Sequence, residues 1–126
     1  MKEQVRERRQ TGRILFTMDQ QVMGRITIPN SQKNPVVVQV LNMSIDGIFF
    51  IIRSVRDVSL KTGDEIIFED IQGRDRKPIR PQIKTKIVWI QDDPDSAYTG
   101  FGSKFLDVES RTLDNLENFM GLYQDN

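Results

Sequence analysis

Residues 36–52 place the tightest limit on what this chain can fold into. Residues 36–43 are rich in β-branched side chains and predict a strand, and residues 48–52 are a continuous apolar run short enough for a buried strand. The polar segment 42–47 lies between them and ends in glycine, which is typical of a tight turn. Strand, turn and strand in succession indicate an antiparallel pair, so the chain is expected to be mainly β.

Similar stretches recur along the chain, separated by Gly, Pro, Asn or Asp residues that favour turns. The further predicted strands are residues 14–17, 22–28, 65–70, 83–90 and 98–106. The last part of the chain differs, because apolar residues recur there at three- and four-residue spacing from Leu113 to Tyr123. This spacing predicts a helix over residues 110–122, with Ser110 as its N-cap. The expected fold is a small antiparallel β-barrel with a C-terminal α-helix.

The composition excludes several classes of function. The chain of 126 residues has no cysteine and no histidine, which excludes disulfides, thiolate chemistry, the common zinc sites and Ser-His-Asp catalysis. No apolar run approaches the roughly 20 residues needed to span a bilayer, and the charged N-terminus lacks the apolar segment of a secretory signal. A cytoplasmic protein that holds no cofactor is therefore expected.

Positive charge is concentrated near the N-terminus, although the chain as a whole carries no net charge. Residues 1–13 contain five cations and two acids, whereas the segment from Asp92 onward contains eight acids and two cations. A protein that binds nucleic acid through phosphate contacts is more often basic overall. A local cationic cluster suits a small polyanion better, so nucleic acid is not the expected partner.

Arg9 and Arg13 lie four positions apart, and Arg8 adds a third guanidinium beside them. Guanidinium is permanently charged, its donors match phosphate oxygens, and its flat face stacks on aromatic rings, including purines. Such a cluster on a flexible arm could clamp a ligand that carries both phosphate and purine. Taken alone, the same residues are more typical of a solvated basic tail.

Asn42, Ser44 and Gly47 form a second motif, Asn-x-Ser-x-x-Gly, in the turn between the two strands. In an extended segment Asn42 and Ser44 point to the same side, and together they offer the mixture of donors and acceptors that a base edge requires. Gly47 permits a positive backbone angle or the close approach of a ligand. Residue types alone favour the simpler interpretation, a turn with only a structural role.

Together the two motifs resemble those of the PilZ domain family, with Arg-x-x-x-Arg before the first strand and Asn-x-Ser-x-x-Gly between two later strands. Arg13 and Asn42 are 29 residues apart here. Residues 60–66, 87–89 and 102–105 are similar to later segments of the family, and the final helix also matches. The resemblance covers residues 6–122, which is nearly the whole chain.

The resemblance implies a six-stranded β-barrel that binds cyclic dimeric GMP (c-di-GMP), a bacterial second messenger, often as a stacked, intercalated dimer. Residues 1–13 are polar and lack a helical apolar stripe, so we expect a flexible or briefly helical arm there, followed by the barrel and helix over residues 14–126. Arg8 matches a position that is often basic in the family, and Asp46 is a secondary candidate within the turn. The ligand-binding residues expected on this basis are Arg8, Arg9, Arg13, Asn42, Ser44 and Gly47.

Three further features have two interpretations each. Trp89, the only tryptophan, could stack on guanine at the edge of the barrel, although large aromatic side chains more often pack in a core or dock a helix. Residues 74–80 are rich in cations and could contact RNA or a partner, but a solvated loop is the simpler interpretation. The acidic segment 92–96 lacks the pattern of a calcium-binding loop, so an acidic turn is expected.

The first functional hypothesis is a non-enzymatic sensor. In it, c-di-GMP orders the arm, and the resulting surface engages a downstream protein in the control of motility, adhesion or biofilm formation. The alternatives are an adaptor of the same fold that does not bind nucleotide, and an RNA-binding barrel. An enzyme would have to rely on carboxylates, and no pair of acids lies in a suitable setting. The downstream partner and the oligomeric state, monomer or dimer, are left open.

Overall fold

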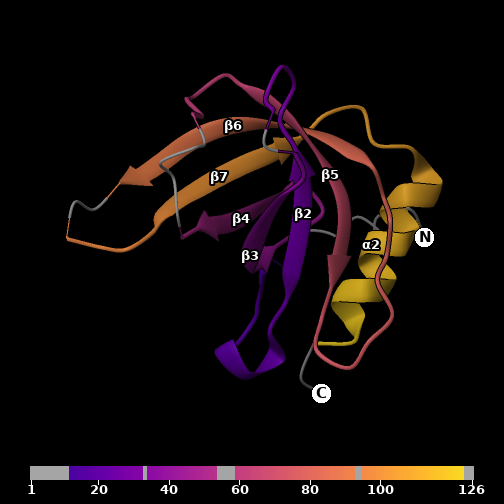
Figure 1. The fold of residues 1–126 in the computed structure, drawn as a ribbon. Coiled ribbons are helices and arrows are strands. Elements are labelled where there is room, and N and C mark those ends of the chain that lie inside the picture. The colour runs from indigo at the N-terminus through magenta and orange to yellow at the C-terminus, as the bar shows by residue number, and fades with distance from the viewer. Residues whose placement is uncertain (1–11, 33, 54–58, 93–94, 124–126) are drawn as a thin grey trace.

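The structure, a computed structural model, describes residues 12–32, 34–53, 59–92 and 95–123. Strands dominate this part of the chain, and a short 3-10 helix and one α-helix accompany them (Figure 1). The elements are β1 (Ile14–Leu15), η1 (Met18–Gln20), β2 (Met23–Thr27), β3 (Val36–Met43), β4 (Gly47–Ile52), β5 (Glu65–Gln72), β6 (Ile83–Asp92), β7 (Thr99–Phe105) and α2 (Ser110–Gly121).

The strands β2 to β7 form a closed antiparallel barrel. Hydrogen-bonded neighbours follow the order β3-β2-β5-β6-β7-β4, and β4 pairs back onto β3 to close the ring. The two residues of β1 add to the free part of β3. The predicted six-stranded barrel with a C-terminal helix is thereby confirmed, and closure leaves few strand edges open to other chains.

Two local predictions need correction. The strand expected at residues 14–17 ends at Leu15, because the chain turns into η1, where the side chain of Gln20 accepts a hydrogen bond of 2.7 Å from the backbone N–H of Thr17. The helix α2 begins at Ser110, so Glu109 holds the N-cap position that the sequence assigned to Ser110.

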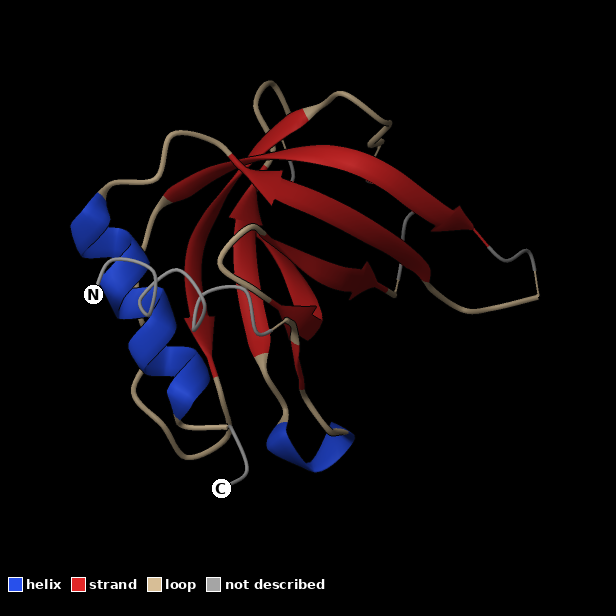
Figure 2. Ribbon diagram, turned by 180° about the vertical axis from the view of Figure 1, so that it is seen from behind, coloured by secondary structure: helices blue, strands red, loops and turns tan. Residues whose placement is uncertain are grey.

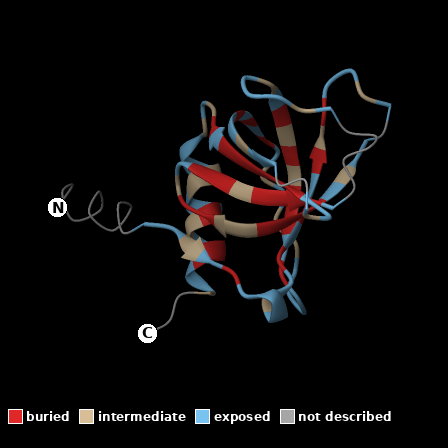
Figure 3. Cartoon of the chain, turned by 90° about the vertical axis from the view of Figure 1, so that its left-hand side faces the viewer, coloured by how far each residue is buried: buried red, intermediate tan, exposed pale blue. Residues whose placement is uncertain are grey.

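The core lies inside the barrel, where alternate residues of each strand point inward. Phe50 is central to it: its ring centroid lies 5.3 Å from that of Phe68 and 5.5 Å from that of Phe101. Burial is concentrated on the strands and on one side of α2, whereas most loop residues are exposed (Figure 3). Each of these fully buried rings contributes roughly 1.5–3 kcal/mol relative to exposure.

The helix α2 lies against one side of the barrel (Figure 2). Its buried residues are Leu116, Phe119 and Met120. Phe16, just after β1, meets Phe119 and Tyr123 edge-on at centroid distances of 6.3 and 5.0 Å. This contact anchors Phe16, three residues after Arg13, to the α2 residue Phe119 and to Tyr123 just after the helix. Within the described residues, no helix is long and apolar enough to cross a membrane.

Candidate functional site

The turn between β3 and β4 is held by its own hydrogen bonds. The backbone N–H of Ser44 donates to the carbonyl of Gly47 at 3.0 Å. The hydroxyl oxygen of Ser44 accepts from the backbone N–H of Asp46 at 3.1 Å. Ser44 is buried and Asp46 is exposed. Serine therefore shapes this turn in the usual way of short hydroxyl side chains, and its hydroxyl proton remains as a donor.

Gly47 is required by packing against β7. A Cβ atom at this position would collide with the carbonyl oxygen of Ser103. The carbonyl of Asp46 accepts from the backbone N–H of Phe105 at 2.8 Å, which fixes the turn to the same strand. Gly47 is not among the described glycines with positive φ, so the expectation of a positive backbone angle is wrong. The close neighbour of Gly47 in the structure is the backbone of β7 at Ser103.

Arg13 is brought to this turn by β1. Ile14 pairs with Met43 and Leu15 with Asn42, so Arg13 enters beside the end of β3. One terminal nitrogen of its guanidinium, Nη1, donates to the side-chain oxygen of Asn42 at 2.9 Å. This bond joins the two sequence motifs directly. Arg8 and Arg9 lie outside the described residues.

Trp89 lies on the outside of the barrel, which contradicts the interpretation as a core or helix-docking residue. Its side chain is 47% exposed, and its ring stacks on Phe49 with centroids 5.0 Å apart and planes 13° from parallel. The register between β6 and β7 shifts between Ile87 and Trp89, so Val88 is an extra residue. Such a bulge reverses the alternation, and it turns Trp89 outward where a regular strand would have pointed it inward with Ile87.

Asn42 and Trp89 belong to one row across the outer face of the barrel. Asn42 pairs with Phe49, Phe49 with Gly102, and Gly102 with Trp89. The two aromatic rings fill the space above the glycines of β7, since a Cβ at Gly102 would collide with the indole and one at Gly100 would lie 2.8 Å from the Phe49 ring. The row therefore runs from the Arg13 contact to an exposed aromatic stack.

Two surface hollows lie in other parts of the barrel. One, of about 410 Å³, is lined by Met23, Gly24, Arg25, Val37, Asp70, Gln72, Pro78 and Arg80. The other, of about 390 Å³, lies between residues 81–84 and residues 106–112. Neither of these hollows includes a described residue of the two motifs. The part of the chain that the structure describes contains no group of His, Cys, Asp or Glu residues that could hold a metal ion.

The secondary candidates are only partly placed. In the cationic loop 74–80, the guanidinium of Arg76 lies over the ring of Tyr123, 5.4 Å from its centroid, and Ile79 forms an isolated bridge with Ile71. Part of this loop thus packs on the barrel and on Tyr123, which follows α2. Asp93 of the acidic segment lies outside the described residues.

Comparisons with known proteins agree with this arrangement. A family model described as the PilZ domain matches residues 7–121, whereas a search of curated protein sequences found no match. Among solved structures, the PilZ domain of YcgR from Escherichia coli with c-di-GMP is similar, with a TM-score of 0.69 and 12% sequence identity. That match covers 92% of this chain and 91% of the other.

Two longer proteins also contain a similar fold. They are the Inhibitor of motility (MotI/DgrA) from Bacillus subtilis, with a TM-score of 0.61 and 14% identity, and the Borreliella burgdorferi PlzA protein in complex with c-di-GMP, with a TM-score of 0.56 and 13% identity. The matches cover 82% and 99% of this chain but only 47% and 59% of those proteins. At these identities the likeness establishes the fold.

Proposed function

This chain belongs to the PilZ domain family, as its two sequence motifs predicted, and we propose that it is a sensor domain that binds c-di-GMP. The observation that carries the proposal is the hydrogen bond between Arg13 and Asn42, which joins the two motifs on the outer face of the barrel. The names of similar structures support the choice of ligand, because the YcgR domain and PlzA were both solved with c-di-GMP.

In this proposal the arginines hold the phosphates and guanines of the ligand. Arg13 donates one N–H to Asn42, and in the proposal its remaining N–H groups donate to phosphate oxygens, which guanidinium binds well. Arg8 and Arg9 precede it in the arm and would close over the ligand. The ligand can be one nucleotide or a stacked pair, since flat guanidinium groups can lie against successive bases.

The turn supplies the other side of the site. Asn42 stands at a fixed position because β3, β4 and β7 hold the turn rigidly, and Ser44 and Gly47 give the turn its shape. Asp46 presents an exposed carboxylate beside them, which can accept hydrogen bonds from the edge of guanine. In the proposal, the turn on one side and the arginines of the arm on the other form a clamp that closes on the ligand.

The output of binding is a changed surface. Fixing residues 1–13 against the barrel converts the arm into a defined surface that a downstream protein can recognise. The domain acts as a cytoplasmic sensor rather than an enzyme in this proposal. A role in motility or biofilm control is consistent with the name of the B. subtilis neighbour, Inhibitor of motility.

Calorimetric titration with c-di-GMP tests the proposal, with GTP and cyclic GMP as control ligands. Arg9→Ala and Arg13→Ala should each weaken binding about ten- to a hundredfold, which corresponds to the roughly 1.5–3 kcal/mol of a hydrogen bond to a charged group. Arg111→Ala, an exposed arginine on α2, is the matched control and should bind normally.

Three results would contradict the proposal. Unchanged affinity in both arm variants would show that the arginines do not hold the ligand. A failure of the unmodified protein to bind c-di-GMP, together with partner binding that ignores the nucleotide, would favour the adaptor. Tight, strongly salt-dependent binding of single-stranded RNA with indifference to c-di-GMP would favour the RNA-binding alternative.

A further inference from the structure

Two lysines lie directly opposite each other on the outer face of the barrel. Lys86 of β6 pairs with Lys104 of β7, and both are exposed. Directly opposed like charges destabilise an antiparallel pair, because their side chains project from the sheet about 5 Å apart. Because this arrangement lowers the stability of the free protein, we looked to ligand binding for a reason for it.

No described carboxylate neutralises either lysine. Glu65 faces Lys86 across β5 and β6, but its carboxylate lies 3.9 Å from the ammonium of Lys84 instead. Within residues 12–32, 34–53, 59–92 and 95–123, no carboxylate forms an ion pair with Lys86 or Lys104. Among the described residues these two adjacent positive charges therefore have no fixed carboxylate partner, and an anion from solution can bind there.

This pair lies beside the turn of the proposed site. Lys104 pairs with Gly47, so it flanks the turn on the β7 side, whereas Arg13 reaches the turn from the β1 side. Gly102, the partner of Trp89, is two residues from Lys104 on the same face, about 7 Å along the strand. Cations and a half-exposed aromatic ring thus surround one patch next to the turn.

We propose that Lys86 and Lys104 form a phosphate-binding subsite that extends the nucleotide site across β7 and β6, with Trp89 as a stacking surface for guanine. The inference rests on the proposed function, and it names residues outside the two motifs. Ammonium groups bind a phosphodiester as point charges, and base stacking on an aromatic ring accompanies such contacts at many nucleotide sites. In this arrangement the ligand lies between Arg13 on one side and the lysine pair on the other.

The test is a calorimetric titration with c-di-GMP of the double variant Lys86→Gln/Lys104→Gln, at low and at moderate salt. Affinity should fall about tenfold at low salt, and the difference from the unmodified protein should shrink as salt screens the exposed charges. The matched control is Lys84→Gln, which lies on the same strand and face but is paired with Glu65. Its affinity should stay close to that of the unmodified protein.

A thermal melt of the free proteins separates binding from folding. The double variant should melt at the same temperature as the unmodified protein or higher, because it loses the repulsion between two like charges. Lys84→Gln should not show such a rise, because it loses the ion pair with Glu65 instead. Binding by the unmodified protein that depends on Arg13 but is equal in the double variant would overturn the lysine subsite alone. No binding by the unmodified protein would overturn the proposed function and this inference together.

Discussion

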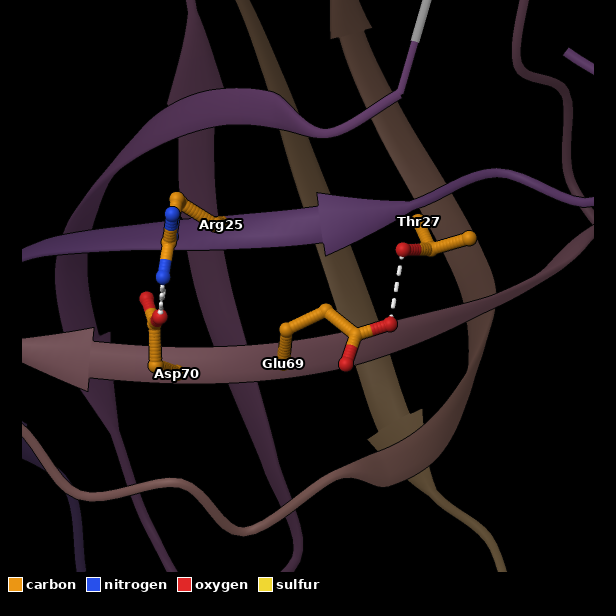
Figure 4. A network of polar contacts seen from close by, with 4 residues as sticks. All are labelled: Arg25, Thr27, Glu69 and Asp70. Atoms are coloured by element: carbon orange, nitrogen blue, oxygen red, sulfur yellow. Dashed lines mark hydrogen bonds and ion pairs between the residues drawn. The ribbon is translucent and has the colours of Figure 1, made fainter.

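Two arginines on the outside of the same barrel have different surroundings. Arg25 of β2 donates from Nε to a carboxylate oxygen of Asp70 at 2.8 Å, and its Nη2 contacts the same oxygen (Figure 4). The hydrogen bond and charge of Asp70 raise the pKa of Arg25 above its ordinary value. Arg13 makes one bond, to the neutral side-chain amide of Asn42, and has no carboxylate partner in the part of the chain that the structure describes.

The difference indicates that Arg25 has a structural role, whereas Arg13 is the cation that we propose for ligand binding. The side chain of Asp70 is only 11% exposed, so Arg25 is needed to keep a nearly buried carboxylate paired. Nearby on the same two strands, Thr27 donates to Glu69 at 2.7 Å (Figure 4), so this acid also has a partner. Among the described residues no acid pairs with Arg13 in that way, and in the proposal its charge meets an anionic ligand.

The largest effect is expected from disturbing the turn without touching either arginine. Gly47→Ala would force a methyl group into the carbonyl of Ser103, and such overpacking costs about 3 kcal/mol. Both the free energy of unfolding and the affinity for c-di-GMP should fall, while the Arg25 pair stays intact. Denaturant unfolding and calorimetry measure the two quantities, and a normally stable, normally binding Gly47→Ala variant would contradict the packing role of this glycine.

Replacing each of the two arginines by alanine tests the comparison directly. Arg25→Ala should lower the unfolding temperature, because it leaves Asp70 without its partner, and should leave c-di-GMP affinity unchanged. Arg13→Ala should do the reverse, with an affinity loss of about ten- to a hundredfold and little change in unfolding. Scanning calorimetry and titration of both variants provide the check. Equal behaviour of the two would remove the distinction between them.

A smaller effect is expected from removing the partner of Arg13. Asn42→Ala deletes one hydrogen bond of a type that contributes about 0.5–1.5 kcal/mol. Affinity should fall about two- to tenfold, less than in Arg13→Ala, because the charge of Arg13 remains. Titration of both variants and of the double variant would show whether the two losses are coupled, as expected for groups in contact. Strictly additive losses would indicate that each residue meets the ligand independently.

The smallest effect concerns a third arginine, Arg76, which lies over the ring of Tyr123. Burial raises the pKa of Tyr123 above its ordinary value of 10.0, and the charge of Arg76 opposes that rise. The folded state therefore keeps the phenol proton to a higher pH than the unfolded state does. The contribution of this proton to the free energy of unfolding is complete below pH 10.0 and is lost as the pH rises through the folded-state pKa. Tyr123→Phe should reduce the loss of stability at alkaline pH, measured as unfolding temperature against pH. The same pH dependence in the variant and the unmodified protein would contradict the role of Tyr123.

Local patterns in the sequence predicted most of the fold. The strand-turn-strand unit at residues 36–52 was predicted because alternation, apolar runs and turn residues act over a few positions. The helix α2 was predicted for the same reason, from its apolar spacing. The orientation of Trp89 was not predictable, because it depends on a bulge at Val88 that no local pattern marks.

The candidate site depended on longer-range geometry. The motifs suggested that Arg13 and Asn42 act together, but their bond arises from the pairing of β1 with β3. The opposition of Lys86 and Lys104 follows from the register of two strands, which the sequence does not fix. The packing of Gly47 against Ser103 was not predictable, because Ser103 is distant in the chain.

The most direct test of the central claim is a nuclear magnetic resonance titration with c-di-GMP that follows individual backbone and side-chain N–H signals. The signals of the Asn42 amide group, the Gly47 backbone and the Trp89 indole should move as ligand is added, and the Nε–H signal of Arg25 should stay in place. Movement at Arg25 with no change at Asn42 and Gly47, or no movement anywhere at high ligand concentration, would contradict the proposed site.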